Sequence, residues 1–206
     1  MSVQTAITPV LAEAALERLT RAKTVLMPTH PNIDADGLAT PLALMHMLER
    51  RGINAMPLVG DGEIPRSLKF LPGIERVVLY GSDALPEYDL LCLLDASDRR
   101  RLGAFYTDDP SRIEDGVPII NIDHHVTNER YGDVAIVDPR ATSTSEVMFR
   151  LMQLWGEPLN PVIAQCLLAG IYGDTLAVRT EVTTPETMRI AADLIEAGAN
   201  PAPISE

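Results

Sequence analysis

Three continuous apolar segments, each followed closely by an acidic or imidazole side chain, constrain the fold of this chain more than any other feature. They span residues 24–28, 90–94 and 117–122. A strand that is apolar along its whole length is typical of a parallel sheet covered on both faces. Because the carboxyl ends of parallel strands lie at one edge of such a sheet, polar residues far apart in the sequence are expected to converge there.

The remaining segments alternate between helical and strand-like patterns. Apolar periodicity and end signals predict helices at residues 9–21, 37–51, 143–155, 160–170 and 184–197. Further strands are predicted at residues 53–59, 75–80 and 134–137, and the second apolar segment extends to a strand at 88–94. Residues 107–116 are predicted to form a polar loop. This mixture favours an α/β fold with an open, mostly parallel β-sheet and helices on both faces.

The charge balance limits the partners of the chain. Its 206 residues suffice for one large domain, and the formal net charge is −12. Such a charge disfavours broad attraction to nucleic acid, so long duplexes are not expected as partners. If the chain handles phosphates, bound divalent cations are the expected attractant, since clustered carboxylates would otherwise repel one another.

The two cysteines and the chain's N-terminal sequence bear on its environment. Cys92 and Cys166 both lie in apolar runs, which predicts buried, reduced thiols. Neither a signal-peptide pattern nor an apolar run long enough to span a membrane is found, so we expect a cytoplasmic protein without a membrane partner. A homodimer is compatible with the sequence, which does not define the oligomeric state.

The candidate metal ligands combine carboxylates with imidazoles, and they follow the apolar segments or a late helix. They are His30, Asp34, Asp36, Asp95, His124 and Asp174. Oxygen and imidazole donors without thiolates suit Mn²⁺, Mg²⁺, Fe²⁺ or Zn²⁺. There are more carboxylates than one ion needs, and two ions about 3.5–4 Å apart are the usual arrangement for phosphate ester hydrolysis.

Each candidate also has an ordinary structural interpretation. Asp36 or Asp95 alone would more often cap a helix, and Asp174 could cap a helix end. A single His30 would more often be a hydrogen-bonded polar residue than a ligand. The joint occurrence favours the metal site, because the structural interpretation requires several independent coincidences at one sheet edge.

Four motifs, in order along the chain, make it resemble the DHH phosphoesterase superfamily. Residues 30–37 read His-x3-Asp-x-Asp-Gly, and residues 93–98 form a strand end in Asp. Residues 121–125 read Asn-Ile-Asp-His-His, and residues 170–175 read Gly-Ile-Tyr-Gly-Asp-Thr. The resemblance covers roughly residues 20–200 and implies a DHH-type catalytic domain.

The resemblance also implies roles for individual residues. One metal would be held by His30, Asp34 and Asp95, and the other by Asp36, Asp95, His124 and Asp174. In that arrangement Asp95 bridges two divalent ions, for which Mn²⁺ is the expected metal. His125 would contact the substrate phosphate, and Asp123 would orient the neighbouring imidazoles.

Further residues are candidates for substrate contact. Residues 139–146 are similar to an Ala-Ser-Thr-x-Glu segment of the short-oligonucleotide phosphodiesterases, which makes Ser143 and Thr144 candidate substrate contacts. Ser143 with Glu146 also fits a helix capping box, and this second role is favoured. Among the three consecutive arginines at 99–101, Arg101 is the candidate phosphate ligand, and structural pairing is expected for at least two of the three.

The chain departs from the family pattern in two respects. Many relatives carry a C-terminal substrate-binding domain with a Gly-Gly-Gly-His-type motif, which these residues lack. We therefore expect residues 1–206 to form a single DHH catalytic domain, without the substrate-binding domain. Leu176 stands where relatives often have Gly.

The sequence favours a metal-dependent phosphoesterase acting on small nucleotides or short oligonucleotides by a two-metal mechanism. Its expected substrates are short RNA oligomers, 3′-phosphoadenosine 5′-phosphate, and cyclic or linear dinucleotides. Two alternatives remain open. One is an inorganic pyrophosphatase or exopolyphosphatase with the same four motifs, and the other is a non-catalytic assembly module with the same fold.

Overall fold

A six-stranded sheet organises the protein. The computed structural model describes residues 7–60 and 63–205. In them the strand order is β3-β2-β1-β4-β5-β6, and every neighbouring pair is parallel. The strands are β1 (Thr24–Pro28), β2 (Asn54–Val59), β3 (Val78–Leu79), β4 (Leu90–Leu94), β5 (Ile119–Asp123) and β6 (Val134–Val137). The predicted open parallel sheet is therefore confirmed.

The strand order reverses in the middle of the sheet. The chain runs outward from β1 through β2 to β3, and then returns to place β4 on the other side of β1. Val25 of β1 pairs with Ala55 of β2 on one side and with Leu90 of β4 on the other. In open α/β sheets, ligands bind at such a reversal, in the crevice beyond the carboxyl ends of the strands.

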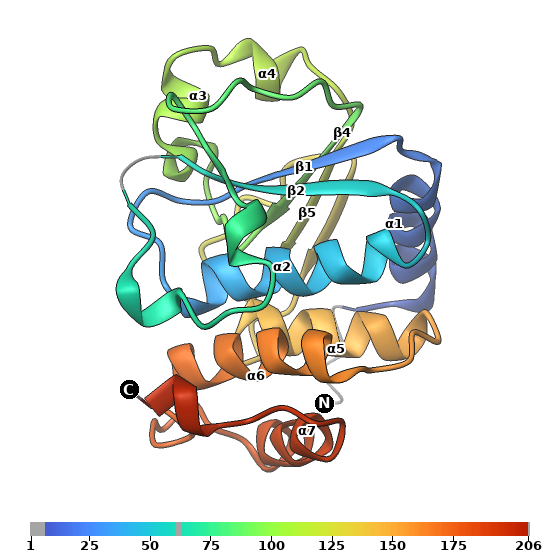
Figure 1. Cartoon of the computed structure of the whole chain (residues 1–206). Coiled ribbons are helices and arrows are strands. Elements are labelled where there is room, and N and C mark those ends of the chain that lie inside the picture. The colour runs from blue at the N-terminus through green and yellow to red at the C-terminus, as the bar shows by residue number, and fades with distance from the viewer. Residues whose placement is uncertain (1–6, 61–62, 206) are drawn as a thin grey trace.

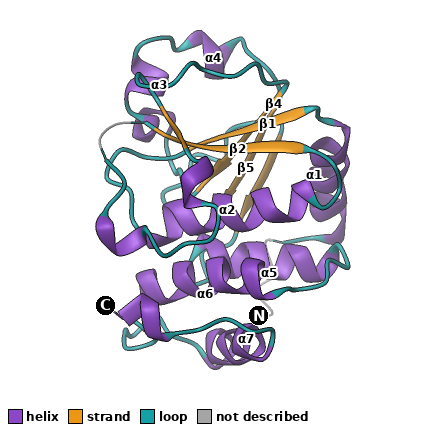
Figure 2. Cartoon of the chain, in the orientation of Figure 1, coloured by secondary structure: helices purple, strands orange, loops and turns teal. Residues whose placement is uncertain are grey.

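Helices cover both faces of the sheet, as Figures 1 and 2 show. The longer helices lie on one side, with α6 packed against α2 and α5, and α7 against α6. The other side carries the short helices. The helices are α1 (Pro9–Arg21), α2 (Ala35–Glu49), α3 (Ala104–Thr107), α4 (Ser111–Glu114), α5 (Thr144–Leu154), α6 (Pro161–Thr175) and α7 (Pro185–Glu196), with 3₁₀ turns at Arg66–Leu68, Ile74–Arg76, Arg99–Leu102 and Ala202–Ser205.

Alternate residues of the central strands enter two separate cores. In β4, Cys92 belongs to the larger core on the side of α1, α2 and α5, whereas Leu91 and Leu93 belong to the smaller one with Phe105. All five residues of β4 are buried. This explains the continuous apolar pattern, because neither face of the strand meets solvent.

Three predictions about individual elements were wrong. The strand predicted at residues 75–80 shortens to β3, because a 3₁₀ turn at Ile74–Arg76 follows the positive φ of Gly73. Residues 107–116 are not a plain loop, since α4 lies within them and buries Ile113. The helix predicted to end at residue 170 continues through Asp174.

Both cysteines are buried and neither forms a disulfide, as predicted. Burial raises the pKa of the Cys166 thiol to about 12 and also raises that of Cys92, so neither is a reactive thiolate.

Among the residues that the structure describes, no helix combines the length and apolarity needed to cross a membrane.

A left-handed turn follows α6 directly. Leu176, Ala177 and Val178 have φ angles of 48°, 57° and 57°. For residues other than glycine this conformation costs about 1–2 kcal/mol each. We expect Leu176→Gly to raise the free energy of unfolding by about 1 kcal/mol, because 62% of Leu176 is already exposed and little burial is lost.

Urea denaturation of the metal-free protein measures this effect. Leu154→Gly is the matched control, since Leu154 is 53% exposed but lies in the last turn of α5, where glycine should lower stability. A loss of stability in both variants would show that the turn after α6 is not strained.

Candidate metal centre

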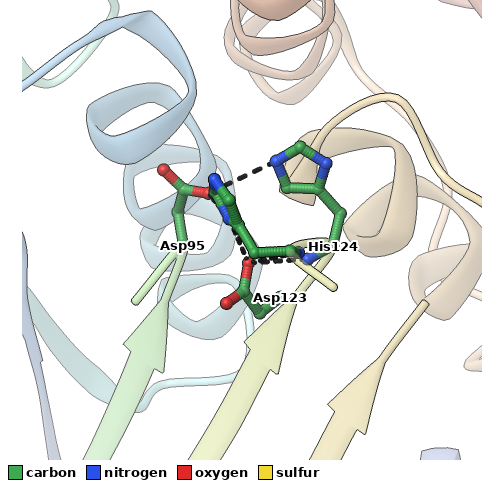
Figure 3. A group of neighbouring side chains, drawn as sticks. Asp95, Asp123 and His124 are labelled. Atoms are coloured by element: carbon green, nitrogen blue, oxygen red, sulfur yellow. Dashed lines mark hydrogen bonds and ion pairs between the residues drawn. The ribbon is translucent and has the colours of Figure 1, made fainter. Parts of the chain in front are cut away.

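The predicted ligands lie in five places around the carboxyl edge of the sheet, which are the ends of β1, β4 and β5, the start of α2 and the last turn of α6. His30 follows β1, and Asp34 is the N-cap of α2, where its side chain accepts a hydrogen bond of 2.8 Å from the Gly37 N–H. Asp95 follows β4, and Asp174 lies in the last turn of α6. Figure 3 shows Asp95 and Asp123 at the ends of adjacent strands, with the His124 imidazole directed toward Asp95.

Asp95 occupies the middle of this arrangement. Its Oδ2 lies 3.6 Å from His30 Nε2, and its Oδ1 lies 3.7 Å from His124 Nε2. The side chain is almost fully buried, and its backbone has a φ of 57°. One carboxylate thus presents a different oxygen to each of two imidazoles, the placement expected of a bridging ligand.

Among the described residues, three groups of side chains meet the geometric requirement for holding an ion, with ligand atoms within 4.8 Å of one another. Two of them consist of predicted ligands: His30, Asp34 and Asp95 in one, and Asp36, His124 and Asp174 in the other. A third group around Asp95 contains Asp123, His124 and His125. The structure therefore brings all six predicted ligands together, and their binding of metal remains a prediction.

Two buried imidazole nitrogens without a hydrogen-bond partner indicate that cations fit the centre. Among the described residues, His30 Nε2 and His124 Nε2 are buried and make no hydrogen bond. His124 Nε2 lies 3.2 Å from Asp174 Oδ2, but without hydrogen-bond geometry. A buried polar atom without a partner costs about 1–3 kcal/mol. Divalent cations would supply the missing partners, and the mixture of imidazole and carboxylate donors suits them.

The electrostatics of the centre favour added positive charge. Burial lowers the pKa of His30, but the Asp34 and Asp95 carboxylates outweigh it and raise the pKa to about 9. Burial likewise opposes protonation of His124, while Asp174 and Asp36 raise its pKa to about 9. Burial, and then the charge of Asp95, raises the pKa of Asp36 to about 6. The buried carboxylates of the metal centre therefore carry negative charge that bound protons or cations would neutralise.

The N-terminus of α5 holds Asp36 in place. Asp36 is fully buried and accepts hydrogen bonds from the Thr144 N–H (2.6 Å), the Ser145 N–H (2.9 Å) and the Thr40 hydroxyl (3.0 Å). The Thr144 hydroxyl donates to Asp95 Oδ1 at 3.0 Å. One helix end therefore fixes two carboxylates of the centre. Sequence reasoning missed Thr40 and Ser145, and only the pairing of α2 with α5 could have revealed them.

Ser143 and Thr144 are both fully buried. Ser143 Oγ accepts a bond from the Glu146 N–H, which confirms the N-cap half of the predicted capping box. The other half is not formed as predicted, because the Glu146 carboxylate accepts bonds from Thr142 and Thr187 instead. Substrate contact by Ser143 and Thr144 remains a prediction, and both hydroxyls already have protein partners.

Asp123 orients the adjacent histidines. Its Oδ1 accepts bonds from the His124 N–H, the His125 N–H and His125 Nδ1, the last at 2.8 Å. Its Oδ2 accepts a bond from Asn128 Nδ2 at 2.6 Å. Burial raises the pKa of Asp123, but the bonds from His125 and Asn128 outweigh it and lower the pKa. The bond to Asp123 raises the pKa of His125 in turn.

The three consecutive arginines have different surroundings. Arg99 lies over the Tyr131 ring at 5.4 Å, and Arg100 pairs with Asp98, so the expected structural pairing of two arginines is confirmed. Arg101 donates to Ser97 Oγ at 3.3 Å. Burial raises the pKa of Asp34, and His30, the Gly37 N–H and finally Arg101 outweigh it and lower the pKa. Of the three arginines, Arg101 is therefore the one whose charge contributes to the lowered pKa of the candidate ligand Asp34.

Gly37 is needed for the position of His30. A Cβ at residue 37 would lie 2.7 Å from His30 Nε2. We expect Gly37→Ala to displace this imidazole and weaken Mn²⁺ binding about 10–100-fold, while the helix itself gains from alanine. Calorimetric titration and urea denaturation of the same protein separate the two effects. Unchanged Mn²⁺ affinity would contradict the assignment of His30.

Comparison with known proteins identifies a family and several relatives. Residues 24–171 match the DHH family, N-terminal domain. The bifunctional oligoribonuclease and PAP phosphatase NrnA of Thermus thermophilus is 35% identical over 188 residues, which cover 88% of this chain and 52% of that protein. The chain spans about half the length of the first curated relatives, 52–55%.

Two solved structures share the fold. An exopolyphosphatase-related protein from Bacteroides fragilis has a TM-score of 0.88 at 24% identity, over 99% of this chain and 60% of that one. The exonuclease RecJ bound to manganese has a TM-score of 0.50 at 18% identity, over 95% of this chain and 49% of that one. At these identities the likeness extends to the fold alone.

Proposed function

This chain belongs to the DHH family, and we propose that it is the catalytic domain of a metal-dependent phosphoesterase that hydrolyses short oligonucleotides or small nucleotides. Its relative in Thermus thermophilus is an oligoribonuclease and PAP phosphatase, which supports this class of substrate. The net charge of −12 supports a short substrate held at a local site over a long polymer bound along its backbone.

One observation carries the proposal: the buried Asp95 carboxylate lies between His30 Nε2 and His124 Nε2, at 3.6 Å and 3.7 Å, and neither of these buried nitrogens makes a hydrogen bond. His30, Asp34 and Asp95 would hold one cation, and Asp36, Asp95, His124 and Asp174 the other. When bound, two divalent cations would supply a water nucleophile near neutral pH and neutralise charge on the phosphoryl oxygens. We propose Mn²⁺, the metal in the RecJ structure of the same fold.

His125 is the residue proposed to contact the scissile phosphate. Its Nδ1 is held by Asp123, which leaves Nε2 as the ring nitrogen available to a substrate. The raised pKa of His125 favours the protonated form, which donates a hydrogen bond to a phosphoryl oxygen. Asp123 acts through this histidine and positions it.

Arg101 supplies a second contact in this proposal. Its charge acts on Asp34 at the edge of the centre, where a phosphate would meet it. Thr144 and the N-cap residue Ser143 would assist indirectly, by fixing Asp36 and Asp95. In this proposal the chain is a single catalytic domain, and its residues His125 and Arg101 supply part of the contacts with the substrate.

The test is an assay of three substrates by protein stripped of metal and reloaded with Mn²⁺. We expect hydrolysis of the linear dinucleotide pApA or of 3′-phosphoadenosine 5′-phosphate, dependent on Mn²⁺ and lost in His124→Gln. Selective cleavage of pyrophosphate would replace this proposal with the pyrophosphatase alternative. Failure to cleave any of the three, with Mn²⁺ bound, would favour the non-catalytic alternative.

A further inference from the structure

We propose that a cavity beside the metal centre is the binding site for the nucleobase next to the scissile phosphate. The cavity has a volume of about 710 Å³. This inference rests on the proposed function, and it assigns the base-recognition role to residues outside the metal centre. Below it is called the base cavity, and its walls include Ile33, Leu68, Phe70, Tyr172, Leu176 and Ala177.

The base cavity adjoins the metal centre at one candidate ligand. The predicted ligand Asp34 lines it, together with Ala35 at the start of α2 and Gly173 near the end of α6. These two helices pack along each other (Figure 1). A phosphate held at the metal centre would therefore have this cavity beside it, on the side of Asp34.

The walls have the chemistry of a base site. Ile33 and Leu68 are buried, while the Phe70 and Tyr172 rings are only partly buried. Aromatic and apolar walls of this kind stack against the face of a nucleobase. The volume lies within the range of about 300–1,000 Å³ that is usual for small-molecule sites. Pyrophosphate has no apolar surface that could use such walls, so the base cavity favours nucleotide substrates.

The rim adds polar groups to the apolar interior. Arg179 lines the cavity, and its Nε donates to the Leu176 carbonyl at 2.7 Å, which fixes the guanidinium beside the strained turn. A cation at this place suits the negatively charged backbone of a nucleotide. Leu176 and Ala177 line the same cavity with positive φ angles, and strain of this kind gathers at ligand sites.

Binding of two probes to the Mn²⁺-loaded protein tests the inference. AMP and ribose 5-phosphate share the sugar and the phosphate but differ in the base. Calorimetry should give AMP at least about tenfold tighter binding, as expected for one stacked base. Phe70→Ala removes one wall, and Ser67→Trp fills the cavity from an exposed position. Both variants should reduce the difference between the affinities for AMP and ribose 5-phosphate. The distant Leu154→Ala variant should keep that difference.

Photolabelling gives a second readout that does not depend on catalysis. 8-Azido-AMP should label Phe70 or Tyr172, and excess AMP should compete. Equal affinities for the two probes, or labelling only outside the base cavity, would overturn the inference.

The two proposals fail separately. Hydrolysis of pApA without tighter binding of AMP than of ribose 5-phosphate would contradict the base-site inference and leave the proposed phosphoesterase function supported. Tighter binding of AMP and labelling of the cavity, without hydrolysis, would support the base site and contradict the proposed catalytic function.

Discussion

Asp95→Asn should lower Mn²⁺-dependent hydrolysis about a thousandfold while the fold stays intact. Asp95 supplies one oxygen to each half of the centre, so the loss of its charge affects both proposed ions. The rate effect is of the size expected when one electrostatic group is removed from an active site, about 10²–10³-fold or slightly more. Initial rates on pApA, with thermal unfolding of the same sample, measure both parts.

Asparagine is the informative substitution at this position. The φ of 57° at Asp95 is one that asparagine tolerates, whereas alanine would add backbone strain. The asparagine carbonyl can still accept the Thr144 hydroxyl bond. Asp98→Asn is the matched control, since Asp98 lies in the same loop and pairs with Arg100. Similar activity in both variants would contradict a bridging role for Asp95.

Gly170→Ala should destabilise the protein by about 3 kcal/mol and reduce activity about a hundredfold. A Cβ at residue 170 would lie 1.9 Å from Ser145 Oγ and 2.6 Å from Asp36 Oδ1. Overpacking of a well-packed core costs about 1–3 kcal/mol, and this contact is at the severe end. Moving α6 away from α5 would also shift Asp36 relative to Asp174, and displacements of about 1 Å can cost about 10²-fold in rate.

A double-mutant cycle separates the contact from a general effect of alanine in α6. Ser145→Gly removes both the hydroxyl and the Cβ that the new methyl group would meet, so it should restore part of the stability of Gly170→Ala. Gly60→Ala is the control outside the helix, because its added Cβ would meet only the Leu102 carbonyl oxygen closely, at 3.2 Å instead of 1.9 Å, and should cost much less. Additive losses in the double variant would show that Ser145 is not the obstacle.

The sequence predicts the sheet and the convergence of the candidate ligands for a physical reason. A strand such as β4 is apolar at every position because both faces are covered, and its end marks the edge where Asp95 lies. Each predicted ligand follows a recognisable local pattern. Their convergence then depends only on the parallel topology, and the reversal between β1 and β4 provides it.

What the sequence does not reveal depends on contacts between distant segments. A Cβ at Gly170 would lie 1.9 Å from Ser145 Oγ, so the close packing of α6 against α5 explains a glycine inside the helix, and no local pattern encodes it. The bonds from Thr144 to Asp36 and Asp95 join residues more than forty positions apart, 108 and 49 along the chain. The base cavity likewise forms only when Phe70 and Tyr172 come together beside α2.

Anomalous scattering from a crystal soaked in Mn²⁺ tests the central proposal of a two-metal centre most directly. We predict two manganese peaks, one beside His30 and Asp34 and the other beside Asp36, His124 and Asp174, with Asp95 in contact with both. A single peak, or peaks away from Asp95, would contradict the two-metal centre.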